Sequence, residues 1–337
     1  MLEKIAHYAR NNKLSDIHIH SDEPLAMRIH GQIHSVPEDV ITRPQLTQFI
    51  ESILDAGQVE HFRKQKDVDL ALPHEELRFR VNIYTTANGP AMVMRKIETQ
   101  LPSLDTLGLP KAVIDAAGHR NGLVLVTGPT GSGKSTTLAA LIDKINQERQ
   151  GNIITVEDPI EFLHHSKSCL VSQREVGRDA VSFATALKAM LREDPDVILV
   201  GEMRDLETVS LALTAAETGH LVFGTLHTNG APNSINRILD VFPAQQQAQA
   251  RSQLSQSLRL VVTQQLLRRA DKPGRIAAFE VMVCNIAVAN MIRENKVFQI
   301  DQAMQTGKST GMMTMEESVK QLIAQGIVDH EGARGGH

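Results

Sequence analysis

The sequence predicts an α/β protein built from two domains, and three observations carry this prediction. Its 337 residues are too many for one small domain and comfortable for two. Between residues 120 and 228, short apolar strands alternate with helices, a pattern typical of a parallel sheet covered on both faces. Residues 77–97 instead carry two strongly alternating strands, which indicate a separate module in the first third of the chain.

Residues 1–97 predict a mixed α/β domain. A helix is expected over 2–11, where Leu2, Ile5 and Ala9 share one face. Alternating residues predict a strand over 16–20 and a hairpin of two strands, 25–30 and 32–36, around Gly31. One or two helices are expected over 44–64. The strands 77–84 and 91–97 then form a second hairpin, with Asn88-Gly89 at its turn.

Residues 98–119 contain Pro102, Gly108, Pro110 and Gly118 and predict a linker. The second domain is expected over 120–337. Its predicted strands are 123–126, 152–156, 197–200 and 221–225, and its predicted helices are 135–148, 182–192 and 205–218. From residue 244 onward, the sequence predicts a mostly helical region to the end of the chain.

Composition excludes several classes of protein. The net charge of −4 argues against a surface dominated by nucleic-acid binding, so no nucleic-acid partner is expected. Cys169 and Cys284 form no C-x-x-C pair, which leaves no support for a zinc ribbon or a disulfide framework. No apolar run approaches the roughly 18 residues of a membrane helix, and the N-terminus lacks the apolar core of a signal peptide. The sequence predicts a cytoplasmic protein without direct membrane insertion.

The stretch from Gly128 to Ser135 fits the phosphate-binding pattern G-x-x-x-x-G-K-[ST] at every fixed position. An apolar strand precedes it and a helix follows it, which is the context that such a loop requires. Lys134 is expected to reach the β- and γ-phosphates of ATP, and the Ser135 hydroxyl to hold Mg²⁺. The residues expected to bind the nucleotide here are Gly128, Pro129, Thr130, Gly131, Ser132, Gly133, Lys134, Ser135 and Thr136.

Acidic residues follow two of the predicted strands. Glu202 ends the apolar strand 197–200, and it is expected to hold Mg²⁺ because Gly201 stands where a Walker B aspartate is common. A second acid must then activate water. Glu157, Asp158 and Glu161 surround Pro159 at the end of strand 152–156, on the ligand side of a parallel sheet. Spacing alone leaves the choice of base open, although Asp158 is suited to capping the turn.

Histidine and arginine side chains complete the candidate site. His227 lies just past strand 221–225 and is expected to sense the γ-phosphate, whereas His220 is equally well explained as a helix-terminus or core residue. Arg78 and Arg80 are two apart on one strand, and Arg95 lies on the next. These three form either an anion site, acting within the chain or on a neighbouring subunit, or a solvated charged face.

Taken in order, these motifs resemble those of the secretion ATPases of bacterial type II secretion and type IV pili, with the closest similarity to pilus retraction ATPases of the PilT type. The resemblance rests on the phosphate loop and on the segments 154–162, 191–205 and 218–228, together with Ser15-Asp-Ile-His. It implies a hexameric ring with a PAS-like N-terminal domain and a RecA-like ATPase domain with a helical C-terminal region. It also implies Glu161 as the general base, with Glu157 second, and N-terminal arginines on the nucleotide.

The resemblance further implies partners and a direction of movement. Assembly ATPases of this superfamily usually carry an extra N-terminal domain and a four-cysteine zinc motif, and because this sequence shows neither, it is expected to resemble the retraction branch. The expected partners are an inner-membrane platform protein and a paralogous pilus ATPase, reached from the cytoplasmic face of the membrane. The C-terminal motif of that branch is only partly matched over 287–294, where Ala289 replaces arginine and Met291 replaces leucine. The alternatives are an accessory ATP-binding subunit, an assembly ATPase and a ring ATPase that translocates nucleic acid.

Overall fold

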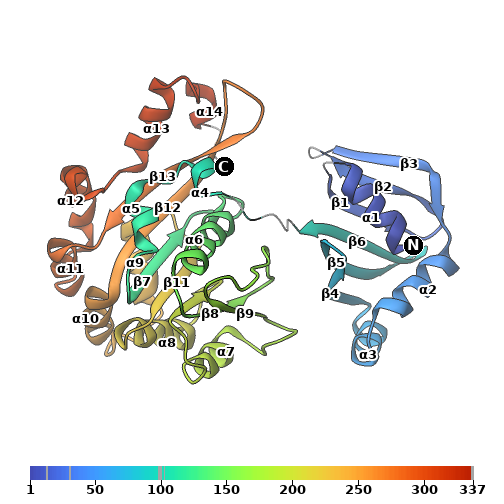
Figure 1. Ribbon diagram of the computed structural model, residues 1–337, viewed down its shortest axis with the longest axis horizontal. Helices are drawn as coiled ribbons and strands as arrows, with labels where there is room; N and C mark the ends of the chain where they lie inside the picture. Colours follow the sequence, from blue (N-terminus) through green and yellow to red (C-terminus); the bar gives the residue numbers. More distant parts are fainter. Residues whose placement is uncertain (13, 30–31, 98–100, 102, 335–337) are drawn as a thin grey trace. The chain divides into compact units, whose positions relative to one another are not determined.

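A computed structural model describes residues 1–337 except 13, 30–31, 98–100, 102 and 335–337. The chain divides into two compact units, Met1–Gln100 and Leu101–His337. Each unit combines helices with one β-sheet (Figure 1), and each has its own hydrophobic core. The prediction of an α/β fold is therefore confirmed.

The first unit is a six-stranded antiparallel sheet in the order β3-β2-β1-β6-β5-β4. Side chains of α1 and α2 pack with alternate strand residues, such as Ile17, Val81 and Met94, in a single core. The elements are α1 (Leu2–Asn11), β1 (Leu14–His20), β2 (Glu23–Ile29), β3 (Gln32–Ile41), α2 (Arg43–Ile53), α3 (Ala56–Gln65), β4 (Asp67–His74), β5 (Leu77–Thr86) and β6 (Gly89–Ile97).

The second unit contains a seven-stranded sheet in the order β13-β12-β7-β11-β10-β8-β9. Its strands pair in parallel from β12 to β9, and β13 joins the edge in antiparallel fashion. The strands are β7 (Gly122–Thr127), β8 (Asn152–Glu157), β9 (Leu170–Glu175), β10 (Val197–Val200), β11 (Leu221–Leu226), β12 (Leu258–Arg268) and β13 (Arg275–Val283).

The helices of this unit fall into three groups along the chain. Two short helices come first, α4 (Leu104–Leu107) and α5 (Lys111–Ala116). The sheet is then interleaved with α6 (Lys134–Glu148), α7 (Phe183–Met190), α8 (Leu206–Glu217), α9 (Ala231–Asp240) and α10 (Gln247–Ser257). After β13 come α11 (Ile286–Arg293), η1 (Val297–Gln299), α12 (Ile300–Thr306), η2 (Lys308–Thr310), α13 (Met315–Ala324) and α14 (His330–Arg334).

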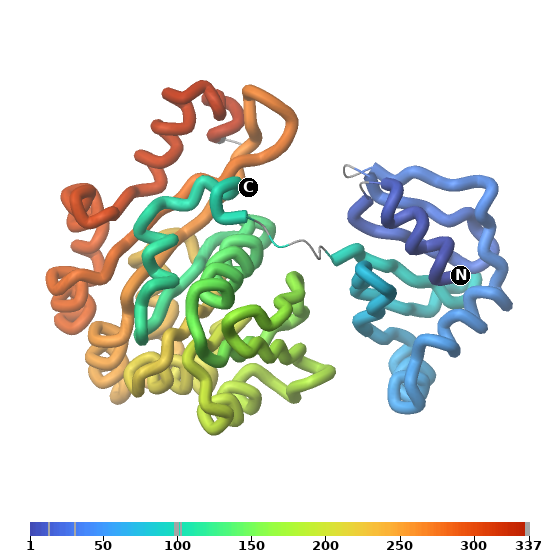
Figure 2. Tube along the Cα trace, viewed as in Figure 1, coloured from blue at the N-terminus to red at the C-terminus, as the bar shows by residue number. Residues whose placement is uncertain are grey.

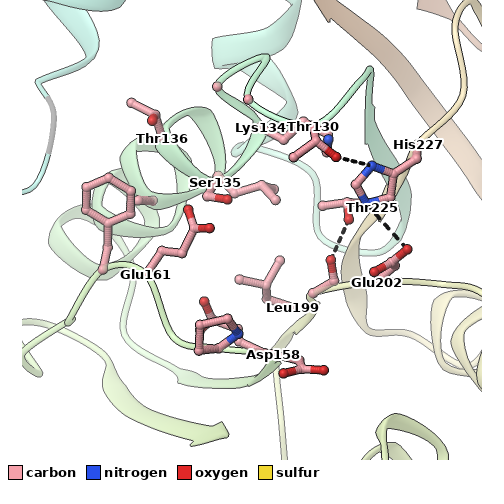
Figure 3. Close-up of a pocket in the computed structure, with 18 of the residues that line it drawn as sticks. Thr130, Lys134, Ser135, Thr136, Asp158, Glu161, Leu199, Glu202, Thr225 and His227 are labelled. Atoms are coloured by element: carbon pink, nitrogen blue, oxygen red, sulfur yellow. Dashed lines mark hydrogen bonds and ion pairs between the residues drawn. The ribbon is translucent and has the colours of Figure 1, made fainter. Parts of the chain in front are cut away.

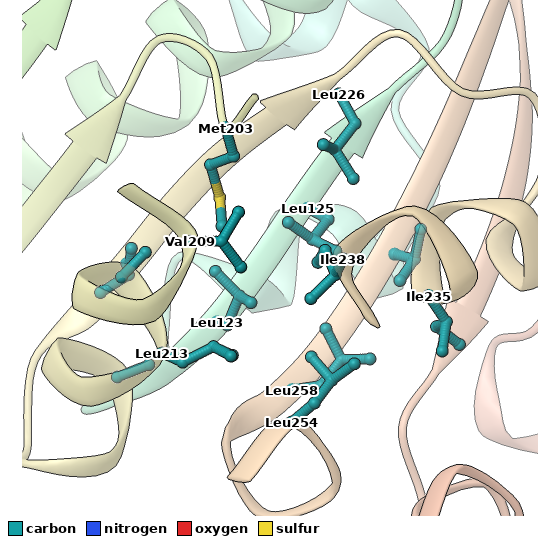
Figure 4. Packing of buried hydrophobic residues seen from close by; sticks show 14 of the residues in the cluster. Leu123, Leu125, Met203, Val209, Leu213, Leu226, Ile235, Ile238, Leu254 and Leu258 are labelled. Atoms are coloured by element: carbon teal, nitrogen blue, oxygen red, sulfur yellow. The ribbon is translucent and has the colours of Figure 1, made fainter. Parts of the chain in front are cut away.

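Two core layers cover the two faces of the parallel sheet. Leu123, Leu125 and Val200 belong to one layer with residues of α8, α9 and α10 (Figure 4). Val124 and Leu199, their neighbours on the same strands, belong to the opposite layer with residues of α5 and α6. Strand residues are thus buried on both sides, which explains why β7, β10 and β11 are almost wholly apolar in sequence.

The structure adds strands that the sequence analysis missed. Strands β12 and β13 occupy part of the region predicted to be helical from residue 244, so that prediction is wrong there. Residues 261–263, Val-Val-Thr, are β-branched and pair with β7 and β13, and this tertiary pairing outweighs the helical interpretation. Strands β4 and β9 lie at sheet edges, where polar residues obscure the pattern.

The segment predicted to be a linker is only partly described. Residues 98–100 and 102 lie outside the described residues. Within 103–119 the chain forms α4 and α5, and Leu109, Val113 and Ala116 are buried in the core layer that contains α6. That part of the segment therefore belongs to the second unit.

Glu280 of β13 links two helices to the sheet. It accepts a hydrogen bond from the backbone N of Ala231, over 2.8 Å, at the start of α9. The backbone N of Met315, at the start of α13, also donates to it. Burial raises the pKa of Glu280, and these two donors oppose that shift. Figure 2 shows the C-terminal helices gathered along the β13 side of the second unit.

In the described part of the chain, no helix is long and apolar enough to cross a membrane.

Candidate nucleotide site

The phosphate loop joins β7 to α6. Strand β7 ends at Thr127, the loop occupies residues 128–133, and α6 begins at Lys134. Gly128 has a φ of 135°, and a Cβ there would overlap the carbonyl oxygen of Gln264 on β12. Only glycine therefore fits where the loop leaves the strand. The backbone N–H groups at the start of α6 face the side of the sheet where a polyphosphate can bind.

A cavity of about 460 Å³ opens at this loop, a size common for small-molecule sites. It lies where β7, β8, β10 and β11 end, at the carboxyl edge of the parallel sheet. Figure 3 shows the arrangement. Of the predicted site residues, the cavity is lined by Thr130, Gly131, Gly133, Lys134, Ser135, Thr136, Glu157, Asp158, Glu161, Glu202 and His227.

Lys134 is held against its own loop. Its Nζ donates to the carbonyl oxygens of Gly128 and Pro129, over 2.8 and 2.9 Å. Burial lowers the pKa of Lys134, and the negative charges of Glu202 and Glu161 oppose that shift. Glu202 and Glu161 line the same cavity as Lys134.

His227 connects the phosphate loop to Glu202. Its Nδ1 lies 3.4 Å from the Thr130 hydroxyl, and its Nε2 lies 3.4 Å from Glu202 Oε1. Burial and the neighbouring Lys134 lower the pKa of His227, which favours a neutral ring. In that form Nε2–H faces the carboxylate and Nδ1 accepts from Thr130. Arg204 forms an ion pair with the same carboxylate.

Gly201 precedes Glu202, where many Walker B strands have aspartate. A Cβ at Gly201 would lie 3.1 Å from both the Cα of Glu157 and the carbonyl oxygen of Val156. Strands β8 and β10 are adjacent, so the backbone at the end of β8 fills the space that a side chain at position 201 would need. The departure noted in the sequence thus has a steric cause.

The three acids after β8 have different surroundings. Glu157 is half-buried, and its Oε1 accepts from the Thr155 hydroxyl over 2.7 Å and from Gln173 Nε2 over 3.1 Å. Burial raises the pKa of Glu157, although both hydrogen bonds oppose this. Glu161 extends toward Ser135 in Figure 3, whereas Asp158 points away from the loop. Glu157 and Glu161 both line the cavity, and of these two the carboxylate of Glu157 is held by Thr155 and Gln173.

His220 lies at the other end of β11 from His227. Its Nδ1 is 2.9 Å from the carbonyl oxygen of Ala215, near the end of α8. His220 therefore lies at the C-terminal end of α8, in agreement with its interpretation as a helix-terminus residue.

The three predicted arginines belong to the first unit. Arg80 on β5 and Arg95 on β6 are cross-strand partners, and Arg78 is two residues from Arg80. Arg78 is buried, whereas the side chain of Arg95 is 66% exposed. Arg95 Nε donates to the buried Asp16 over 2.8 Å. Burial acts to raise the pKa of Asp16, but hydrogen bonds from Ser15 and Arg95 outweigh it and lower the pKa.

Several cavity residues escaped the sequence analysis. Arg204 and Arg275 bring positive charge to the cavity from the second unit itself, and Leu266 and Phe183 add apolar surface. Arg204 is only two residues after Glu202, so proximity in sequence was an available signal. Arg275 and Leu266 lie on the unpredicted hairpin of β12 and β13, and no local pattern marked them.

A strand, a glycine loop and a helix, with acids on the neighbouring parallel strands, define a P-loop nucleotide-binding protein. Comparison with known proteins narrows this class. The family model of the type II/IV secretion system proteins matches residues 1–334. The chain belongs to that family, and the predicted class, a secretion-type ATPase, is confirmed.

Three relatives are particularly similar. A twitching motility protein of Neisseria gonorrhoeae is 49% identical over 310 residues, covering 91% of this chain and 83% of its own. The type IV pilus retraction ATPase PilT of Pseudomonas aeruginosa is 46% identical over 321 residues, covering 95% and 93%. The crystal structure of the pilus retraction motor PilT with bound ADP superposes with a TM-score of 0.93 at 43% identity, covering 100% of this chain and 96% of that one.

Proposed function

We propose that this protein is a homohexameric motor that hydrolyses ATP with Mg²⁺ and drives retraction of type IV pili. The observation that carries the proposal is the convergence of Lys134, Glu161 and Glu202 on one cavity, in a chain 46% identical to a pilus retraction ATPase. The motor would act at the cytoplasmic face of the inner membrane. There it would work on a membrane platform protein, alongside a paralogous pilus ATPase.

Each residue of the cavity has a distinct part in this proposal. The backbone of the loop from Gly128 to Thr136 cradles the phosphates, and Lys134 neutralises the β- and γ-oxygens. Glu161 accepts the proton of the attacking water. Glu157, half-buried and hydrogen-bonded, supports the loop that carries Glu161. His227 reports the γ-phosphate to Glu202, because it lies between Thr130 and that carboxylate.

The oxygen donors of the site fit a magnesium ion. The Ser135 hydroxyl and the Glu202 carboxylate are hard ligands, and Mg²⁺ binds through one or two such groups together with substrate phosphates. When bound, Mg²⁺ supplies charge neutralisation for the phosphate oxygens.

Arg78, Arg80 and Arg95 are proposed to act on the phosphates in hydrolysis. Arg80 and Arg95 are the suitable pair, since they lie side by side in register and are substantially exposed. Asp16, the cross-strand neighbour of Arg95 on β1, holds its guanidinium through a hydrogen bond. Removal of an arginine that stabilises charge in phosphoryl transfer costs about 10³-fold or more in kcat.

The enzymatic part is tested by three substitutions in the full-length protein. Lys134→Ala should abolish ATP turnover. Glu161→Gln should retain nucleotide binding while kcat falls by about 10²-fold or more, because general base catalysis contributes on that scale. Glu157→Gln serves as the comparison and should retain more activity. If Glu157→Gln alone stops hydrolysis, Glu157 is the base.

The cellular part is tested by counting surface pili in a strain that lacks the gene, with complementation. More pili and lost surface motility are expected for a retraction motor. A strain without pili would identify an assembly motor instead. An unchanged count would indicate an accessory subunit or a redundant motor, and Ala289 would then be the first substitution to reverse.

A further inference from the structure

The loop that carries Glu161 has little regular structure of its own. It runs from Glu157, the last residue of β8, to His164. Side chains of the neighbouring edge strand β9 hold its backbone. Glu175 Oε2 accepts from the backbone N of Ile160 over 3.1 Å, and Gln173 Oε1 accepts from the backbone N of His164 over 2.8 Å.

Gln173 makes the larger share of these contacts. Besides accepting from His164, its Nε2 donates to the carbonyl oxygen of Phe162 over 3.0 Å and to Glu157 Oε1 over 3.1 Å. Both amide hydrogens and the amide oxygen are thus engaged. A reversed amide would present a donor to the His164 N–H and an acceptor to the Phe162 carbonyl, so the surroundings define its orientation.

The carboxamide of Gln173 therefore does for the loop what a peptide group does in a β-ladder. It donates to one residue and accepts from the residue two positions on. Glu161 lies between two fixed points, because Ile160 is held by Glu175 and Phe162 by Gln173. Gln173 and Glu175 alternate along β9 and share one face of the strand.

We infer that Gln173 is a positioning residue for hydrolysis, which fixes the loop so that Glu161 stays at the reacting end of the cavity. The inference rests on the proposed role of Glu161 as base. Gln173 does not line the cavity, so it acts through the loop rather than on the nucleotide. A displacement of about 1 Å in a catalytic group can cost about 10²-fold in rate.

The substitution Gln173→Glu tests whether hydrogen-bond donation by Gln173 is needed. When ionised, the new side chain cannot donate to Phe162, and it places a second carboxylate against Glu157. When protonated it regains a hydroxyl donor. The ionisable groups facing this position are Glu157 on β8, Glu161 and His164 in the loop, and Glu175 on β9. The activity of Gln173→Glu relative to the parent should therefore rise as the pH falls from 8.5 to 6.

The experiment measures steady-state ATP turnover and ADP binding in the full-length protein. Gln173→Ala should lower kcat about 10- to 100-fold while KM and the Kd for ADP stay within about twofold. Ser172→Ala, an exposed neighbour on β9, is the matched control and should match the parent. Thermal denaturation confirms that each variant is folded; if Gln173→Ala is not, Gln173→Glu carries the test.

Each outcome has a defined meaning. Parental kcat in folded Gln173→Ala, a change confined to KM, or a pH-independent activity ratio for Gln173→Glu would overturn the positioning role. The variant Glu161→Gln, measured in parallel, separates this inference from the proposed function. If Glu161→Gln is inactive while Gln173→Ala is normal, the base assignment stands and only the positioning role fails. If Glu161→Gln retains full kcat, both fail.

Discussion

Burial strongly affects the protonation of His164, a side chain that lines the cavity. Burial lowers its pKa from an ordinary value of about 6.5 to about 4. Between these two values the unfolded chain binds the proton and the folded chain does not. Protonation of His164 in the unfolded chain therefore leaves the free energy of unfolding unchanged above about pH 6.5 and lowers it as the pH falls toward 4.

This shift predicts a pH-dependent stability. The free energy of unfolding of the second unit should fall by about 3 kcal/mol between pH 6.5 and 4 through His164 alone. Urea unfolding at a series of pH values tests this, with His164→Asn as the comparison because its side chain cannot be protonated in this range. The pH dependence of the variant should be flatter than that of the parent by this amount. Parallel curves would contradict the assignment.

The site residues that could be predicted from the sequence are those that lie close in sequence to a recognisable strand. The phosphate loop and the acids after β8 and β10 were predicted because each lies within a few residues of a recognisable strand. Arg204 escaped although it pairs with Glu202 in the fold. Gln173 could not be found from the sequence, because its function arises from side-chain hydrogen bonds to residues between nine and sixteen positions away.

At the scale of elements, the close packing of β8 against β10 makes Gly201 a steric requirement. Gly201→Ala should lower the free energy of unfolding by about 1–3 kcal/mol, because the new methyl group lies 3.1 Å from the backbone at the end of β8. Gly57→Ala in α3 is the control. There the nearest atom belongs to the Asp55 side chain, at 3.3 Å, and alanine is the better helix former.

Chemical denaturation of the two glycine variants distinguishes them. We expect a lower midpoint for Gly201→Ala and an equal or higher midpoint for Gly57→Ala. An unchanged midpoint for Gly201→Ala would mean that β8 and β10 can separate without cost, and the steric explanation for the missing aspartate would be wrong.

Strands that are buried on both faces were easier to predict from the sequence than strands at the edge of a sheet. Strands β7, β10 and β11 are apolar along their length because helices cover both faces, and the sequence located each of them. Strand β9 has polar, partly exposed residues because it lies at a sheet edge, and β4 does likewise, so neither was predicted. The hairpin of β12 and β13 was taken for helix, since its pairing with β7 is set by residues more than 130 positions away.

At the scale of the whole molecule, the proposed ring predicts that subunits can share a site. Arg95→Ala and Lys134→Ala should each inactivate a homogeneous hexamer. Mixed in equal amounts and reassembled, they should recover activity at about a quarter of the sites, because a neighbour can supply the residue that each lacks. This prediction treats Lys134 and Arg95 as parts of one site that come from different subunits. Lys134, Arg204 and Arg275 line the cavity of the second unit, whereas Arg95 belongs to the first unit.

The mixing experiment is read by ATP turnover against the two unmixed proteins. Arg63→Ala, an exposed arginine on α3, is the control and should be active before mixing. No recovery in the mixture would place Arg95 in the site of its own chain. Full activity of unmixed Arg95→Ala would remove this arginine from the mechanism.

The contacts of Glu280 with the first turns of α9 and α13 suggest how such a motor could transmit force. One carboxylate holds the first turns of α9 and α13, and α9 follows His227 by only four residues. A shift of a few tenths of an ångström at that histidine has little flexible chain in which to dissipate. In the proposed motor, such a shift would be passed through Glu280 to the helices that follow β13.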